Sequence, residues 1–153
     1  MSLELSAVAI WAYLLFALAA GAMLPIQFGI NAQLATWVGG SVRAAFVSFV
    51  VGTAALLLAV LATTRGWPDH AGDAPWWVWT GGLLGAFYVV GSIVTAPKLG
   101  AATLVALILA GQAIASLLVD HFGWVGFEEH PVTLLRVLGI LLLAGGVALV
   151  RLS

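Results

Sequence analysis

Amide side chains lie in an apolar stretch near the start of the chain, from Gly21 to Leu34, where such groups are uncommon. Gln27 and Asn31 are four residues apart and would point the same way from a helix. Pro25 has no N–H to donate, so we expect a kink in the helix just before this pair. The backbone carbonyl left without a partner is tolerated inside a bilayer only where protein or a water-filled cavity covers it. The two amides could bind a small polar solute, or could join one helix to another.

A second polar series follows later in the chain. Gln112, Ser116 and Asp120 are spaced by four and predict one polar stripe along an otherwise apolar helix. Gln112 and Ser116 have the same two interpretations as the first amides. Asp120 could contact a substrate, or could lie at the helix end, paired with Arg136 or with nothing. Tyr88 could reach into a cavity or merely pack.

The residue patterns of catalysis are missing. We find no paired buried carboxylates, no Ser/His/Asp set and no phosphate-binding glycine loop, so an enzyme is not expected. The chain has no cysteine and no basic patch, which argues against thiolate metal sites and nucleic acid. Six acids and histidines are scattered over two loops, so no metal or other cofactor is expected: Asp69, His70, Asp73, His121, Glu128 and His130.

Composition places these residues in a membrane. Of the 153 residues, 63% are apolar and only 7% are charged, whereas a soluble domain carries about 25% charged residues. Five segments are long enough to cross a bilayer, at about 5–34, 42–64, 76–96, 101–122 and 131–150. The sequence therefore predicts an all-α integral membrane protein, with a single five-helix transmembrane domain over residues 1–153.

Several residues suggest where these helices begin and end. Ser41 is an expected N-cap for the second helix, and Pro131 is expected in the first turn of the fifth. The segment 97–100 is expected to form a short turn between the third and fourth helices.

Small residues recur at spacings that let helices approach closely. Gly52 lies four residues after Ser48, and Gly81 lies four before Gly85. We expect these glycines, with Gly139 and Gly145 of the fifth helix, to serve helix packing or dimer contacts.

Positive charge gives little preference for one orientation. With five spans, Arg65 and Arg136 lie on one side, and Arg43, Lys98 and Arg151 on the other. Cytoplasmic loops normally hold a clear excess of Lys and Arg. The near balance allows two oppositely inserted copies, which together would form an inverted repeat with a substrate site near the midplane. A weakly biased but uniquely oriented protein is the alternative.

Six motifs in order resemble one known family. They are Gln27-x-x-x-Asn31-Ala-Gln-Leu34, Ser48-Phe49-x-x-Gly52, Gly81-Gly82-x-x-Gly85, Pro97-x-Leu-Gly-Ala, Gly111-Gln112 and Asp120-His121-Phe122-Gly123. Together they span nearly the whole chain, which resembles the YdcZ family of the drug/metabolite transporter superfamily.

The resemblance implies half of an EamA-like ten-helix inverted-repeat transporter in the bacterial inner membrane. It implies a second copy in opposite orientation as partner, and favours an exporter of a small polar or organic-cation solute working by alternating access. A dual-topology channel, a subunit that needs a paralogous partner and a non-transporting partner protein are the alternatives. The superfamily's small multidrug resistance branch couples export to protons through a first-helix glutamate. Here the only acid near the first span is Glu4, at its extreme start.

Overall fold

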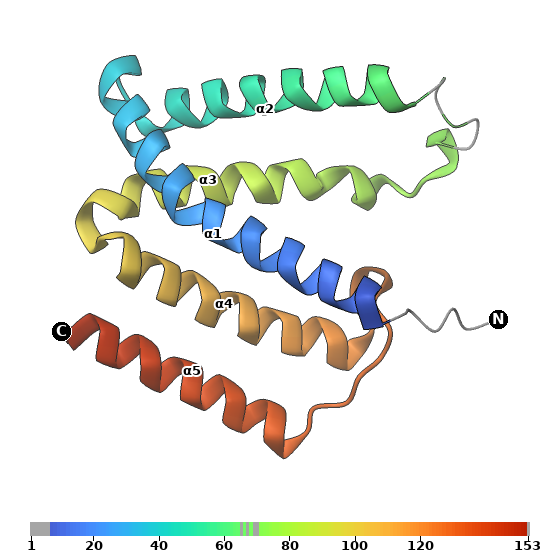
Figure 1. The fold of residues 1–153 in the computed structure, drawn as a ribbon, viewed down its shortest axis with the longest axis vertical. Helices are drawn as coiled ribbons and strands as arrows, with labels where there is room; N and C mark the ends of the chain where they lie inside the picture. The colour runs from blue at the N-terminus through green and yellow to red at the C-terminus, as the bar shows by residue number, and fades with distance from the viewer. Residues whose placement is uncertain (1–6, 65, 67, 69–70, 153) are drawn as a thin grey trace. The chain divides into compact units, whose positions relative to one another are not determined.

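The computed structural model describes residues 7–64, 66, 68 and 71–152, and their regular structure is entirely helical (Figure 1). The α-helices are α1 (Ala7–Val38), α2 (Ser41–Thr63), α3 (Gly81–Leu99), α4 (Ala101–Phe122) and α5 (Leu134–Leu152). Short 3₁₀ turns are η1 (Ala71–Asp73), η2 (Trp76–Thr80) and η3 (Trp124–Gly126). Within the described residues, five helical stretches, with η2 extending α3, are long and apolar enough to cross a membrane. The expected all-α membrane architecture with five spans is confirmed.

The chain forms two compact units. Unit 1 covers Met1–Lys98 and contains α1, α2 and nearly all of α3, whereas unit 2 covers Leu99–Ser153 and contains α4 and α5. The assignment of all 153 residues to one domain stays a prediction. The predicted start of the first span, together with Glu4, Arg65, Asp69 and His70, lies outside the described residues.

Small residues of α2 allow the helices of unit 1 to meet. Ala44 and Ala45 are buried against Val89 and Ile93 of α3, with residues near the end of α1 packed around them. Phe28 of α1 is also buried and meets Tyr88 edge to face, with ring centroids 6.0 Å apart. Alanines offer little side-chain bulk, so α1 and α3 can both pack on the start of α2.

The first helix is longer than expected. It continues past Leu34 to Val38 and passes through Pro25 without interruption, and its ribbon changes direction in its later half (Figure 1). Gly39 and Gly40 then have φ of 75° and 142°, which stops the helix. The expected Ser41 N-cap is wrong: Ser41 is the first helical residue, and Gly40 is the N-cap, whose carbonyl accepts from Ala44 N–H.

The expected turn at 97–100 is also wrong for most of its length. Pro97 lies inside the last turn of α3, which runs to Leu99, so only Gly100 separates α3 from α4. Gly100 has φ of 75°, a conformation that glycine adopts at little cost. Proline removes one hydrogen bond and crowds a carbonyl, which bends or weakens a helix but need not end it one residue later.

The expected start of the fifth helix is wrong as well. Pro131 is not helical, because α5 begins at Leu134. Thr133 is the residue before the first turn, and its Oγ1 accepts from Arg136 N–H at 3.3 Å while its carbonyl accepts from Val137 N–H at 3.1 Å. A threonine hydroxyl can satisfy a backbone donor of the first turn, which makes Thr133 the cap of α5 and leaves Pro131 in the link before it instead of in the first turn.

Candidate functional site

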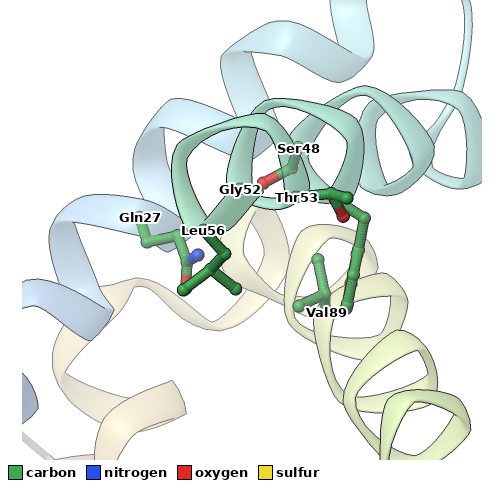
Figure 2. A pocket seen from close by; sticks show the side chains of 7 residues that line it. Gln27, Ser48, Gly52, Thr53, Leu56 and Val89 are labelled. Atoms are coloured by element: carbon green, nitrogen blue, oxygen red, sulfur yellow. The ribbon is translucent and has the colours of Figure 1, made fainter. Parts of the chain in front are cut away.

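A hollow of about 210 Å³ lies within unit 1, and we call it the α1–α3 hollow. Its lining residues come from all three helices: Gln27, Ser48, Phe49, Gly52, Thr53, Leu56 and Val89. Figure 2 shows Gln27 of α1, Val89 of α3 and the α2 side chains arranged around it. The hollow therefore lies in the middle of segments long enough to span a bilayer.

Helical spacing explains how α2 contributes most of this lining. Ser48, Gly52 and Leu56 are four residues apart, so they follow one face of α2. Apart from its two chain neighbours and the nearby backbone of its own helix, no heavy atom of the described residues lies within 4 Å of the point where a Cβ would stand on Gly52, so this glycine leaves open space beside the hydroxyl of Ser48. The small residues Ser48 and Gly52 therefore leave room for the hollow on this face of α2.

The chemistry of the α1–α3 hollow is that of uncharged hydrogen bonds. Gln27 supplies an amide, and Ser48 and Thr53 supply hydroxyls, among apolar walls that include Phe49 and Leu56. An amide both donates and accepts, and each hydroxyl can do either. No residue in the lining is ionisable. Such a site can orient a small polar molecule but offers it no fixed charge.

The structure gives Gln27 and Asn31 different surroundings. Gln27 is exposed and lines the hollow, whereas Asn31 is only 3% exposed and does not. Asn31 Nδ2 and Tyr88 Oη are both buried and have no hydrogen-bond partner among the described residues. A buried polar atom without a partner is uncommon and usually has a structural or functional reason.

The later polar stripe borders a second space, within unit 2. A groove of about 270 Å³ between α4 and α5, the α4–α5 groove, is lined by Ala113, Ser116, Leu117, Asp120, Arg136, Gly139, Ile140 and Leu143. Ser116 and Asp120 are therefore brought together, while Gln112 is exposed and outside this lining.

Asp120 is paired across the groove. Arg136 donates from Nη1 to Asp120 Oδ2 at 3.3 Å and to the carbonyl of His130 at 3.4 Å. The backbone N–H of His130 in turn donates to the carbonyl of Asp120 at 2.8 Å. Of the alternatives that the sequence left open for Asp120, pairing with Arg136 is the one present in the structure. Arg136 was not expected to line a site, although its sixteen-residue separation from Asp120 fits two adjacent helix ends.

Most glycines singled out in the sequence face open space within the chain. A Cβ on Gly52, Gly81, Gly139 or Gly145 would meet no heavy atom within 4 Å, whereas one on Gly85 would lie 3.5 Å from the ring of Phe49. A dimer role for these glycines stays a prediction. No group of three His, Asp or Glu side chains within the described ranges is arranged to hold a metal ion.

Comparison with known proteins identifies the family of this chain. The family model described as "Putative inner membrane exporter, YdcZ" matches residues 12–149. The chain belongs to the YdcZ family. It is similar to "Inner membrane protein YdcZ" of Escherichia coli (strain K12), with 30% identity over 148 residues, covering 92% of this chain and 95% of that protein. No solved structure matches it.

Family membership confirms the resemblance read from the six motifs. Together with the five membrane-length helices, it makes the chain a multi-pass inner membrane protein of a transporter family.

Proposed function

We propose that this protein exports a small polar or organic-cation solute across the inner membrane by alternating access. The observation that carries the proposal is the α1–α3 hollow, where Gln27, Ser48 and Thr53 gather within three membrane-length helices. Polar groups inside such helices are costly unless they contact protein, water or a solute. Membership of a family described as inner membrane exporters supports the same conclusion.

The transporting unit that we propose is an antiparallel homodimer of oppositely inserted copies. Five spans would place the two ends of the chain on opposite sides of the membrane. Two positive residues would then lie on one side and three on the other, which is little bias toward either orientation. Two inverted copies would supply ten helices, the number in an EamA-like inverted-repeat transporter, with the substrate between them. The open glycines Gly52, Gly81, Gly139 and Gly145 would then let helices of the two copies pack closely, whereas Gly85 would serve packing against Phe49 within one chain.

The proposed substrate contacts follow the polar residues of both units. Gln27 would contact the solute from the α1–α3 hollow, and Ser116 and Asp120 from the α4–α5 groove. Asn31 and Tyr88 would use the polar atoms that have no partner among the described residues. Gln112, which is exposed in one chain, would contribute from the polar stripe of α4.

One observation favours a channel as the second candidate. The α1–α3 hollow has no ionisable residue in its lining, so it offers no obvious group to couple solute movement to protons. A channel would pass solute rapidly down its gradient at a rate that a pH gradient does not change. An exporter would show saturable flux at rates typical of alternating access, which involves motions on microsecond to second timescales.

The test is solute flux in proteoliposomes that contain the purified protein. We expect saturable uptake or efflux for at least one member of a panel of polar and cationic solutes. Gln27→Leu should reduce that flux about tenfold or more, the effect of removing a contact worth ~1.4 kcal/mol. Gln33→Leu is the matched control, because Gln33 is an exposed amide of α1 outside the hollow.

Orientation is tested separately by a tag at the carboxyl terminus. In intact cells, a dual-topology population would be labelled in part from outside and in part only after permeabilisation. Labelling from one side alone would overturn the antiparallel homodimer. Absence of flux for every solute in correctly folded protein would overturn transport itself.

A further inference from the structure

The α4–α5 groove contains a positive and a negative side chain held next to each other. Arg136 Nη1 lies 3.3 Å from Asp120 Oδ2, and the two side chains are 38% and 30% exposed. Both residues line the groove, together with Ser116 on the same helix as Asp120 and Gly139 on the same helix as Arg136. A molecule in the groove would therefore meet both charges at once.

Neither charged group is fully used by the protein. A guanidinium has five N–H donors, but both hydrogen bonds of the Arg136 side chain come from Nη1, to Asp120 and to the His130 carbonyl. Among the described residues, none bonds Arg136 Nε or Nη2, and none bonds Asp120 Oδ1. Several donors and one carboxylate oxygen thus remain for a ligand.

The pairing of opposite charges decides which ligand fits. A lone cation roughly 4 Å from Asp120 would stand roughly 7 Å from the guanidinium, and the repulsion would cancel more than half of the attraction because Coulomb energy falls as the inverse of distance. A lone anion at Arg136 meets the same cancellation from Asp120. A ligand with both charges, placed in the opposite sense, is attracted at both ends.

We propose that the α4–α5 groove binds a zwitterion with a primary ammonium and a carboxylate or phosphate. The ammonium lies beside Asp120, where its N–H groups donate to the carboxylate, and the anionic group accepts from the unused N–H donors of Arg136. Leu117 and Ile140 line the same groove and contact the carbon skeleton. The absence of a side chain at Gly139 leaves room beside Arg136.

Two kinds of zwitterion could enter a groove between membrane-length helices. One is a free zwitterionic solute such as an α-amino acid, and in that case the inference rests on the proposed function and narrows its substrate. The other is the headgroup of phosphatidylethanolamine, and in that case it is independent of transport. Asp120 lies in the last turn of α4 and Arg136 in the first turn of α5, close to where a span meets the headgroups.

The experiment measures binding instead of flux, so its failure and the failure of transport are separate results. Purified protein is analysed by native mass spectrometry with equal amounts of phosphatidylethanolamine, phosphatidylcholine and phosphatidylglycerol. In parallel, alanine, ethylamine and acetate are tested for a shift in the melting temperature. We expect preference of about tenfold for phosphatidylethanolamine over both other lipids, or a shift with alanine alone, because only these ligands both donate ammonium N–H groups to Asp120 and present an anionic group to Arg136.

Variants connect the binding to the ion pair. Asp120→Asn and Arg136→Gln should each remove the preference, while Arg151→Gln, at the other end of α5, should keep it. Because an unpaired charge could impair folding, the exchange Asp120→Arg with Arg136→Asp is included. It keeps both charges in the groove and should retain preference for the zwitterion.

The outcomes separate the sources and the alternatives. Phosphatidylethanolamine retention that depends on both residues identifies a lipid site, and an alanine shift that depends on both identifies a solute site. Equal retention of phosphatidylcholine or phosphatidylglycerol, an equal shift with ethylamine or acetate, or binding unchanged by Asp120→Asn and Arg136→Gln would each overturn the proposal.

Discussion

The ring of Phe49 on α2 lies 3.5 Å from the point where a Cβ would stand on Gly85 of α3. This is an ordinary van der Waals distance, so the ring packs against α3 at a position that has no side chain. Phe49 also lines the α1–α3 hollow. The shape of the hollow thus depends on residue 85 having no long side chain, although Gly85 itself is outside the lining.

Substitution of Gly85 by leucine should close or reshape the α1–α3 hollow. The new side chain must displace the Phe49 ring, and overpacking of this kind costs about 1–3 kcal/mol. We expect lower thermal stability and at least a several-fold loss of flux, whereas Gly85→Ala should retain both. The control is Gly91→Leu, because a Cβ on Gly91 meets no atom within 4 Å. Full flux in Gly85→Leu would show that the hollow is not on the transport path.

Substitution of Asn31 by leucine should make the isolated chain more stable. The amide is 3% exposed and its Nδ2 has no partner within the described ranges, so a side chain of similar size without polar atoms removes a desolvation cost of about 1–3 kcal/mol. Tyr88→Phe deletes the other unpaired atom and should act in the same direction. Chemical unfolding in detergent measures both changes. A marked fall in stability would mean that Asn31 is hydrogen-bonded in the assembled protein.

The positions of the helices were predictable because membrane segments follow from composition. A chain with 7% charged residues can keep those charges in the links and near the helix ends, so uncharged apolar runs of span length identify α1 to α5. The ends of the helices were less predictable. Ser41 and Thr133 are both plausible caps, but the choice depends on backbone geometry, which gave the cap to Gly40 in one case and to Thr133 in the other.

The candidate site was predictable only in part. Gln27 and Ser116 could be chosen because polar side chains inside apolar helices are costly without a partner. In the structure Gln27 lines the α1–α3 hollow and Ser116 lines the α4–α5 groove. Four-residue spacing could not separate Gln27 from Asn31, because burial depends on what the neighbouring helices place opposite each position. Thr53 and Val89 join the hollow through tertiary packing that no local pattern encodes.

Replacement of Thr133 by alanine should weaken the start of α5. Its Oγ1 accepts from Arg136 N–H at 3.3 Å, and loss of such a cap costs about 1 kcal/mol. Thr133→Ser keeps the hydroxyl and should restore stability. Hydrogen exchange of the first turn of α5 measures the effect locally. Equal exchange in Thr133→Ala and the parent chain would argue against capping.

Replacement of Gly123 by alanine should be costly because Gly123 ends α4 with φ of 60°. A Cβ there would lie 2.7 Å from Glu129 Cγ and 3.3 Å from the carbonyl oxygen of Phe127. The left-handed conformation alone costs a non-glycine residue roughly 1–2 kcal/mol. Adding Glu129→Ala should recover only part of the loss, since the backbone conformation and the carbonyl remain. Complete recovery in the double variant would assign the whole cost to the Glu129 side chain.

Small changes of charge should turn the proposed dual topology into a single one. Lys98→Gln with Arg151→Gln leaves Arg43 alone on its side, against Arg65 and Arg136, whereas Arg65→Gln leaves three positive residues against one. Because the excess of Lys and Arg sets orientation, the two variants should insert in opposite senses.

Flux provides the readout for this pair of variants. Each alone should lose transport if the working unit needs both orientations, and co-expression should restore it because the two chains then supply opposite copies. Arg65→Lys keeps the charge and serves as the control. Full transport by either variant alone, with labelling of its carboxyl terminus from one side only, would contradict the antiparallel homodimer while leaving the α1–α3 hollow as the solute site.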